Sequence, residues 1–127
     1  MICSVPMTTT SGLRIAALLG LLAVALGAFG AHSLKDILAR NGTALIWEKA
    51  VFYHFIHAVM LFILASRSRF KAGPWWSFLI GIVLFSGSLY LLALTNVRWL
   101  GGITPFGGIS FLAGWLCLAI APSPNIQ

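Results

Sequence analysis

The sequence is poor in charged side chains, and especially in acidic ones. Its 127 residues include 8 Lys and Arg and 2 Asp and Glu, so 8% of the chain is charged, whereas 60% is hydrophobic. Soluble domains carry roughly 25% charged and 45–50% apolar residues. The shortage of charge excludes a soluble enzyme, because too few polar side chains remain to cover a surface in water.

Cysteines and catalytic constellations are also scarce. Cys3 lies in a polar segment and Cys117 inside an apolar run, a pattern that is typical of neither a disulfide framework nor a Cys-rich metal site. Asp36 and Glu48 lie at the edges of apolar runs, and no serine or cysteine has a recognisable base. We therefore expect a non-enzymatic protein with no catalytic residues, no metal ligands and no cofactor.

Long apolar runs are abundant. A membrane-spanning helix needs ~20 largely apolar residues, so the chain has room for four spans and not for six. This predicts an all-α membrane protein, with four transmembrane helices in a bundle and a short interfacial helix after the first span. The expected organisation is a flexible tail over 1–12, one transmembrane domain over 13–121 with spans at about 13–31, 47–66, 75–95 and 104–121, and a C-terminal tail over 122–127.

The mixed segment after the first span predicts the interfacial helix. Ser33–Asp36 has the form of a helix cap with an acidic residue at its third position. Leu34, Ile37 and Leu38 fall on one helix face, and Asn41-Gly42 is a stop signal. A short helix with one apolar face is typical of the membrane surface.

Capping and turn residues mark the starts of the later spans. Thr43 is expected to cap the second span, Pro74 suits the start of the third, and Thr104-Pro105 begins the fourth. Gly101-Gly102 and Gly107-Gly108 bracket Thr104-Pro105. We expect these glycines to permit a broken, re-entrant turn.

The basic residues are interpreted as topology signals, and no nucleic-acid partner is expected. Lys and Arg are scattered singly at the edges of apolar runs, apart from Arg67, Arg69 and Lys71, which cluster in one very short loop. The positive-inside rule is most reliable for such loops, so we expect both termini on the cytoplasmic side of the membrane. Arg14 followed by an apolar core and the small residues of Gly27–Ala31 also resembles a secretory signal peptide, but three further spans favour a retained helix.

Ionisable groups inside the spans are the candidate functional residues, because charges are costly in a bilayer. His54 and His57 share a helix face with Trp47 and Ala50, which we expect to point into the bundle. Three interpretations remain open for the histidines: neutral side chains bonded to hydroxyls of a neighbouring helix, a metal or haem site, and a proton relay or substrate contact. The candidate intramembrane polar site comprises His32, Tyr53, His54, His57, Ser86 and Tyr90.

Within the third span, hydroxyl-bearing residues point in two directions. Ser86 and Tyr90 are four residues apart on one face, and Ser88 and Thr95 are seven apart on another. We expect ordinary hydrogen bonds between helices at both faces.

Small residues recur at a spacing of four, which lets membrane helices approach closely. The repeats are Ala23, Gly27 and Ala31; Ser77 and Gly81; and Ser110 and Gly114. They predict close packing within the chain or between copies. The candidate packing positions are Gly27, Gly30, Gly81, Gly107, Gly108 and Gly114.

Several segments together resemble the domain-of-unknown-function 423 family of small bacterial inner-membrane proteins. They are Gly27–His32, Trp47 with Tyr53 and His57, Phe85–Tyr90, Thr104–Gly108, Phe111 and Gly114-Trp115. The resemblance covers nearly all of the chain between the first and fourth spans. It does not include His54, and it implies a four-helix plasma-membrane protein without a cleaved signal peptide and without an established activity. The resemblance implies that the positions to test first are His32, Tyr53, His57, Ser86, Tyr90 and Pro105.

The expected function is that of an accessory or scaffold component of the membrane. Such a protein would pack in the lipid bilayer against copies of itself or against a larger complex. A small oligomeric transporter or channel is the alternative, and a metal- or haem-binding membrane protein is the third hypothesis.

Overall fold

The computed structural model describes residues 9–121. Over these residues the chain folds as the expected all-α membrane protein, and four of its helical stretches are long and apolar enough to cross a bilayer. The elements are α1 (Thr9–Ala31), α2 (Lys35–Asn41), α3 (Ala44–Ser66), α4 (Ala72–Gly81), the π-helical turn η2 (Ile82–Ser86), α5 (Gly87–Thr95), the 3-10 turn η3 (Arg98–Gly102) and α6 (Thr104–Ile120). The third span is thus α4, η2 and α5 in succession.

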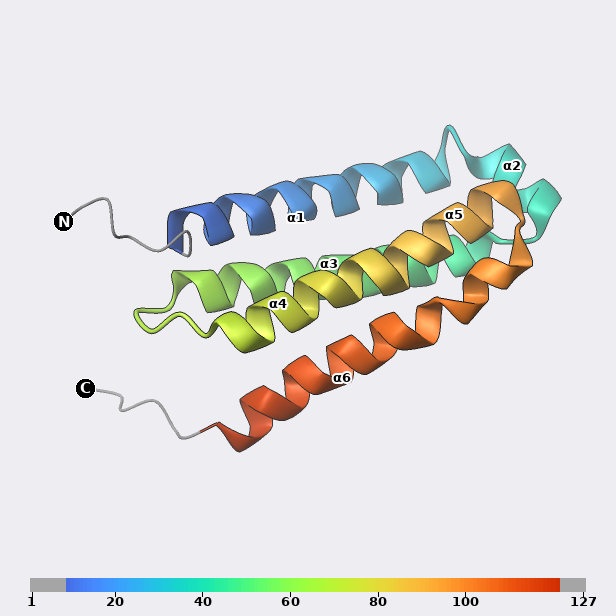
Figure 1. The fold of residues 1–127 in the computed structure, drawn as a ribbon. Coiled ribbons are helices and arrows are strands. Elements are labelled where there is room, and N and C mark those ends of the chain that lie inside the picture. Colours follow the sequence, from blue (N-terminus) through green and yellow to red (C-terminus); the bar gives the residue numbers. More distant parts are fainter. Residues whose placement is uncertain (1–8, 122–127) are drawn as a thin grey trace.

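The third span and α3 form the centre of the fold. Figure 1 shows α1 and α6 on opposite sides of this pair. α1 packs mainly on α3, whereas α6 packs on α4 and η2. The larger core cluster lies where the helices meet, and it consists of Ala16, Leu61, Leu64, Ala65, Trp75, Phe78, Ile82 and Phe111.

The helices begin before the apolar runs do. α1 begins at Thr9, so residues 9–12 of the expected tail are helical, while the rest of that tail, with Cys3, and the expected tail over 122–127 lie outside the described residues. α3 and α4 each begin three residues before the expected span. The physical reason is that hydropathy marks only the part of a helix that lies in the hydrocarbon, whereas the helix itself continues to the interface, where Trp47 and Trp75 lie near the starts of α3 and α4.

The short helix α2 forms, but not with the expected cap. Its N-cap residue is Leu34, and no side chain caps the helix. The turn before it is held by backbone bonds instead, including the 2.8 Å bond from the Leu34 N–H to the Phe29 carbonyl. Gly42 ends the helix as expected, in the left-handed region at φ 66°. Leu38 is buried against Trp47, as one apolar face of α2 predicts.

The Thr43 hydroxyl does not cap α3. It donates to the Ala93 carbonyl at 2.8 Å, and the Asn41 amide donates to the same carbonyl at 3.0 Å. The last carbonyls of a helix have no partner inside that helix. The side chains of Asn41 and Thr43 therefore satisfy a carbonyl at the end of α5.

The expected re-entrant turn is wrong for Gly107-Gly108. Both residues lie inside α6, and only Gly101-Gly102 belong to an irregular turn, η3. A Cβ at Gly107 would overlap the backbone of Phe85. The glycine is there because α6 approaches η2 closely, not because the backbone of α6 breaks.

Candidate functional site

His54 and Tyr90 meet in the middle of the bundle. The His54 side chain is 1% exposed, and its Nδ1 lies 2.8 Å from the Tyr90 hydroxyl of α5. One turn earlier, the Ser86 hydroxyl donates to the Ala50 carbonyl of α3 at 2.8 Å. Ser86 and Tyr90 thus face α3 together, and two polar bonds join α3 to the third span.

His57 is hydrogen-bonded through both ring nitrogens. A carbonyl oxygen can only accept, so Nδ1–H donates to the Tyr53 carbonyl at 2.7 Å. Nε2 then accepts from the indole N–H of Trp115 at 3.0 Å. The ring is stacked on Phe111, with a centroid distance of 3.7 Å. These bonds define a neutral imidazole and leave His57 without a free nitrogen for a metal ion.

Tyr53 borders a hollow between α3 and α6. The hollow has a volume of about 360 Å³, and His57, Phe85 and Trp115 also line it. Tyr53 is 37% exposed, and its ring lies 4.6 Å from that of Phe85 between centroids. The expected polar site is therefore divided into a sealed part at His54 and an aromatic part that opens at Tyr53.

His32 lies apart from the other candidate residues. It is exposed in the turn that follows α1, near the membrane boundary, and it is not joined to His54 or His57. In residues 9–121, no group of three or more His, Cys, Asp and Glu side chains is placed to hold a metal ion. Of the three interpretations, bonding to a hydroxyl of a neighbouring helix describes His54, whereas His57 bonds to a carbonyl of α3 and to an indole of α6.

Trp115 was not among the candidate residues, although it is the partner of His57. Tryptophan is typical of the membrane interface, and this one lies well inside α6. This depth, and its place in the Gly114-Trp115 segment of the family resemblance, are the sequence signals that could have drawn attention to Trp115.

Two more hydroxyl bonds fix α6 to the third span. Ser110 donates to the Ser77 carbonyl at 2.6 Å, and the hydroxyls of Ser88 and Thr104 lie 2.7 Å apart. Thr95 was expected to bond outward like Ser88, but its hydroxyl donates to the Leu91 carbonyl of its own helix. A threonine in a helix commonly donates its hydroxyl to the carbonyl four residues earlier, and Thr95 does so within α5.

The packing glycines of α4 and α6 accommodate aromatic rings. A Cβ at Gly81 would overlap Phe111, and one at Gly114 would lie 2.6 Å from Phe78. Gly108 differs from these, because its Cβ would meet only the Phe85 ring, at an ordinary 3.9 Å.

In α1, Gly30 admits the indole of Trp47. A Cβ at Gly30 would overlap this ring, whose N–H donates to the Leu26 carbonyl one turn earlier at 2.9 Å. A Cβ at Gly27 would lie 3.3 Å from Val51. These small residues are used in packing α1 on α3 of the same chain.

The fold and its core define the class: a multi-pass α-helical membrane protein whose spans are joined by buried polar bonds and by glycine contacts. Residues 26–108 match the family described as "Protein of unknown function (DUF423)". The chain belongs to this family, as its motifs indicated.

Related proteins match over most of their length. The chain is 49% identical over 111 residues to a UPF0382 membrane protein of Staphylococcus epidermidis, covering 84% of this chain and 90% of the relative. It is 41% identical over 113 residues to UPF0382 membrane protein YwdK of Bacillus subtilis, covering 84% and 91%. It is 41% identical over 119 residues to UPF0382 inner membrane protein YgdD of Escherichia coli K12, covering 90% of each chain. No solved structure matches the chain.

Proposed function

We propose that the protein is a non-enzymatic component of the plasma membrane that associates with copies of itself or with a larger membrane complex. The observation that carries the proposal is the exposure of the outer helices. In the most apolar stretch of each outer span, 17% of the residues are buried, against 39% in α3 and 44% in the third span. Wide faces of α1 and α6 are thus free to meet lipid or a partner.

The buried polar side chains inside the spans are hydrogen-bonded to groups of the chain itself, which supports an accessory role over transport. A polar path would need side chains along the spans that remain accessible to water. Ser86 is fully buried and His57 is 4% exposed, and both are bonded to groups of the chain itself. These bonds stabilise the bundle and leave no described chain of accessible donors across it.

We also propose that both termini face the cytoplasm. The start of α1, the end of α6 and the connection between α3 and α4 lie at one end of the molecule (Figure 1). That connection carries Arg67, Arg69 and Lys71, which favour the cytoplasmic side. A membrane-impermeant thiol reagent applied to whole cells should label Ser33→Cys but not Ser68→Cys, in a background of Cys3→Ser and Cys117→Ser. The reverse labelling would contradict this orientation.

Association can be tested through Cys117, which is exposed on α6. In native membranes containing the Cys3→Ser variant at low expression, a short thiol crosslinker should convert a constant fraction of the protein into one product of defined mass. The mass distinguishes a second copy from another subunit. A cysteine placed at buried Ala58 of α3, without Cys117, is the matched control and should give no product.

A single lipid-bound monomer would contradict the proposal. It would give crosslinking that falls with dilution of the protein in the membrane, as expected for random collisions. It would also give equal yields for Cys117 and for a cysteine at Leu21 on the exposed face of α1.

A further inference from the structure

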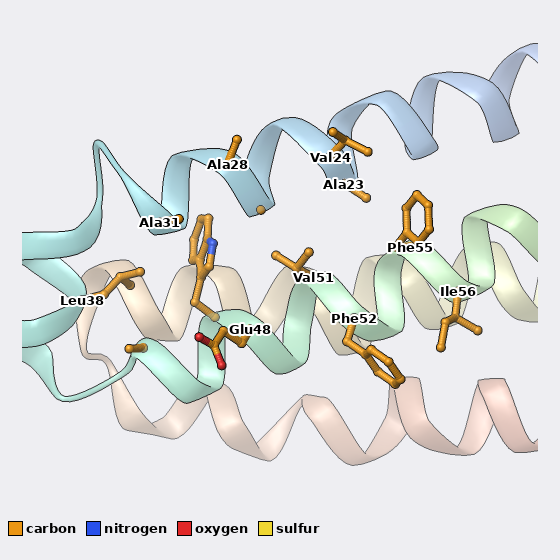
Figure 2. A pocket seen from close by; sticks show the side chains of 14 residues that line it. Ala23, Val24, Ala28, Ala31, Leu38, Glu48, Val51, Phe52, Phe55 and Ile56 are labelled. Atoms are coloured by element: carbon orange, nitrogen blue, oxygen red, sulfur yellow. The ribbon is translucent and has the colours of Figure 1, made fainter.

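A groove lies between α1 and α3, and it is larger than the hollow at Tyr53. Its volume is about 700 Å³, within the range of small-molecule sites. Figure 2 shows Ala23 of α1 across from Val51 and Phe55 of α3, with Ala28 and Ala31 farther along α1, and all five residues line the groove. The groove exists because α1 contributes mainly alanine and glycine on this side, which leave the space between the helices unfilled.

The length of the groove corresponds to one leaflet. Its lining on α3 extends from Ala44 to Ile56, a rise of about 18 Å at 1.5 Å per residue. The hydrocarbon core of a bilayer is ~30 Å thick. The groove therefore begins near the α2 end of the molecule and ends about midway through the membrane.

The groove carries an acidic side chain near its α2 end. Among the described residues that line it, Glu48 has the only charge, and Figure 2 shows its carboxylate beside the groove below Ala31. The whole chain has 8 Lys and Arg but 2 Asp and Glu. Four basic residues belong to the same end of the molecule, but none of them lines the groove; they are Lys35, Arg40, Lys49 and Arg98. Beside the groove itself, the Glu48 carboxylate disfavours an anionic headgroup and attracts a cationic one.

We propose that this groove binds one acyl chain of a membrane lipid whose headgroup carries a free ammonium, and that Glu48 accepts hydrogen bonds from that ammonium. The apolar walls match the acyl chain, and an ammonium supplies both the charge and the N–H donors that a carboxylate needs. A helix of a second copy fits less well, because it would cover Glu48 with apolar side chains and leave a charge unpaired. The proposal goes beyond the association proposed above and does not depend on it.

The test is lipid selectivity of the full chain. The protein is reconstituted in phosphatidylcholine vesicles with a small fraction of spin-labelled phosphatidylethanolamine, phosphatidylcholine or phosphatidylglycerol. Electron paramagnetic resonance then gives the fraction of each label that the protein immobilises. Phosphatidylethanolamine and phosphatidylcholine are both zwitterionic, but only the former has N–H donors. We expect phosphatidylethanolamine to associate about threefold to fivefold more strongly, the size of an interfacial ion pair.

Matched variants assign the selectivity to the groove. Glu48→Gln should bring the preference close to unity, whereas Asp36→Asn, which removes the other acidic side chain at the same end, should leave it unchanged. Ala28→Phe should fill the groove and release the immobilised lipid, whereas Leu21→Phe on the exposed face of α1 should not. Helix content from circular dichroism shows that each variant is folded.

Three results would overturn the proposal. They are equal association of the zwitterionic lipids, a preference for phosphatidylglycerol, and a phosphatidylethanolamine preference that Glu48→Gln does not change. Displacement of all labelled lipid by crosslinked dimers, with a crosslink formed from a cysteine at Ala28, would identify a second copy as the occupant instead.

Discussion

The two outer helices are held to the centre of the fold by different means. α6 is joined by hydroxyl bonds at Ser110 and Thr104, by the Trp115 bond to His57, and by aromatic rings that fill the space at its glycines. α1 packs on α3 through Gly30 and Trp47, and these two residues also line the groove that stays open between the two helices. The difference teaches that small residues close an interface where the facing groups fill the space beside them, as Phe78, Phe85 and Phe111 do at the glycines of α4 and α6. Where the facing side chains fill that space only in part, as between α1 and α3, a binding surface remains.

The largest effect is expected at Gly107. Gly107→Ala should destabilise the protein by about 2–3 kcal/mol, because the new Cβ meets the backbone of Phe85, which cannot turn away as a side chain can. The measurement is reversible unfolding in mixed micelles of mild detergent and dodecyl sulfate. Gly108→Ala is the matched control and should change the free energy of unfolding by less than about 0.5 kcal/mol. Equal effects at the two glycines would contradict the close approach of α6 to η2.

The corresponding change on the α1 side should cost less. Gly30→Ala is expected to destabilise by about 1–2 kcal/mol, because the indole of Trp47 can rotate away at the expense of its bond to Leu26. Tryptophan fluorescence of a variant that retains only Trp47 would report that rotation. Gly20→Ala, where no atom lies within 4 Å of the new Cβ, should be neutral. If Gly30→Ala destabilised the protein as much as Gly107→Ala, the α1–α3 contact would be as rigid as the α6–η2 contact, and the proposed difference between them would be contradicted.

Loss of the Trp115 bond should have a smaller effect. Trp115→Phe keeps a ring in α6 but leaves the His57 Nε2 acceptor without its donor, at a cost of about 1 kcal/mol. The same unfolding titration measures it. Trp76→Phe, at a 44% exposed position of α4, is the control and should be close to neutral. If Trp115→Phe and Trp76→Phe changed the free energy of unfolding equally, the bond between Trp115 and His57 would contribute nothing to stability.

The smallest single effect is expected where α2 leads into α3. Thr43→Val should cost about 0.6 kcal/mol, because the Ala93 carbonyl keeps the Asn41 amide as a donor. Asn41→Ala combined with Thr43→Val should cost more than the sum of the two single changes, since the carbonyl then loses both donors. Additive effects would show that the two donors act independently.

Much of the architecture could be predicted from the sequence. Four apolar runs predicted the four spans, and the helical periodicity placed Trp47, Ala50, His54 and His57 on the inward face of α3, where all four are buried. These features depend on composition and on the periodicity of single helices, which a sequence displays directly.

The contacts between helices could not be predicted in the same way. Nothing local distinguishes Gly107 from Gly108, or indicates that Trp115 reaches His57 across 58 positions of the chain. Such pairs depend on how far each helix is shifted along its neighbour. The same is true of the groove, which depends on where the small residues of α1 lie along the larger side chains of α3.

The central claim is that the interface between α6 and the third span is closed, whereas the groove between α1 and α3 is open. The most direct test is to measure how accessible nitroxide labels at these two places are to oxygen in the bilayer. A label at Ala28 lies in the groove, and one at Ser110 replaces a bond to the third span. The account predicts a mobile, oxygen-accessible label at Ala28 and an immobile, poorly accessible one at Ser110. An immobile, inaccessible label at Ala28 together with a mobile, accessible one at Ser110 would contradict it.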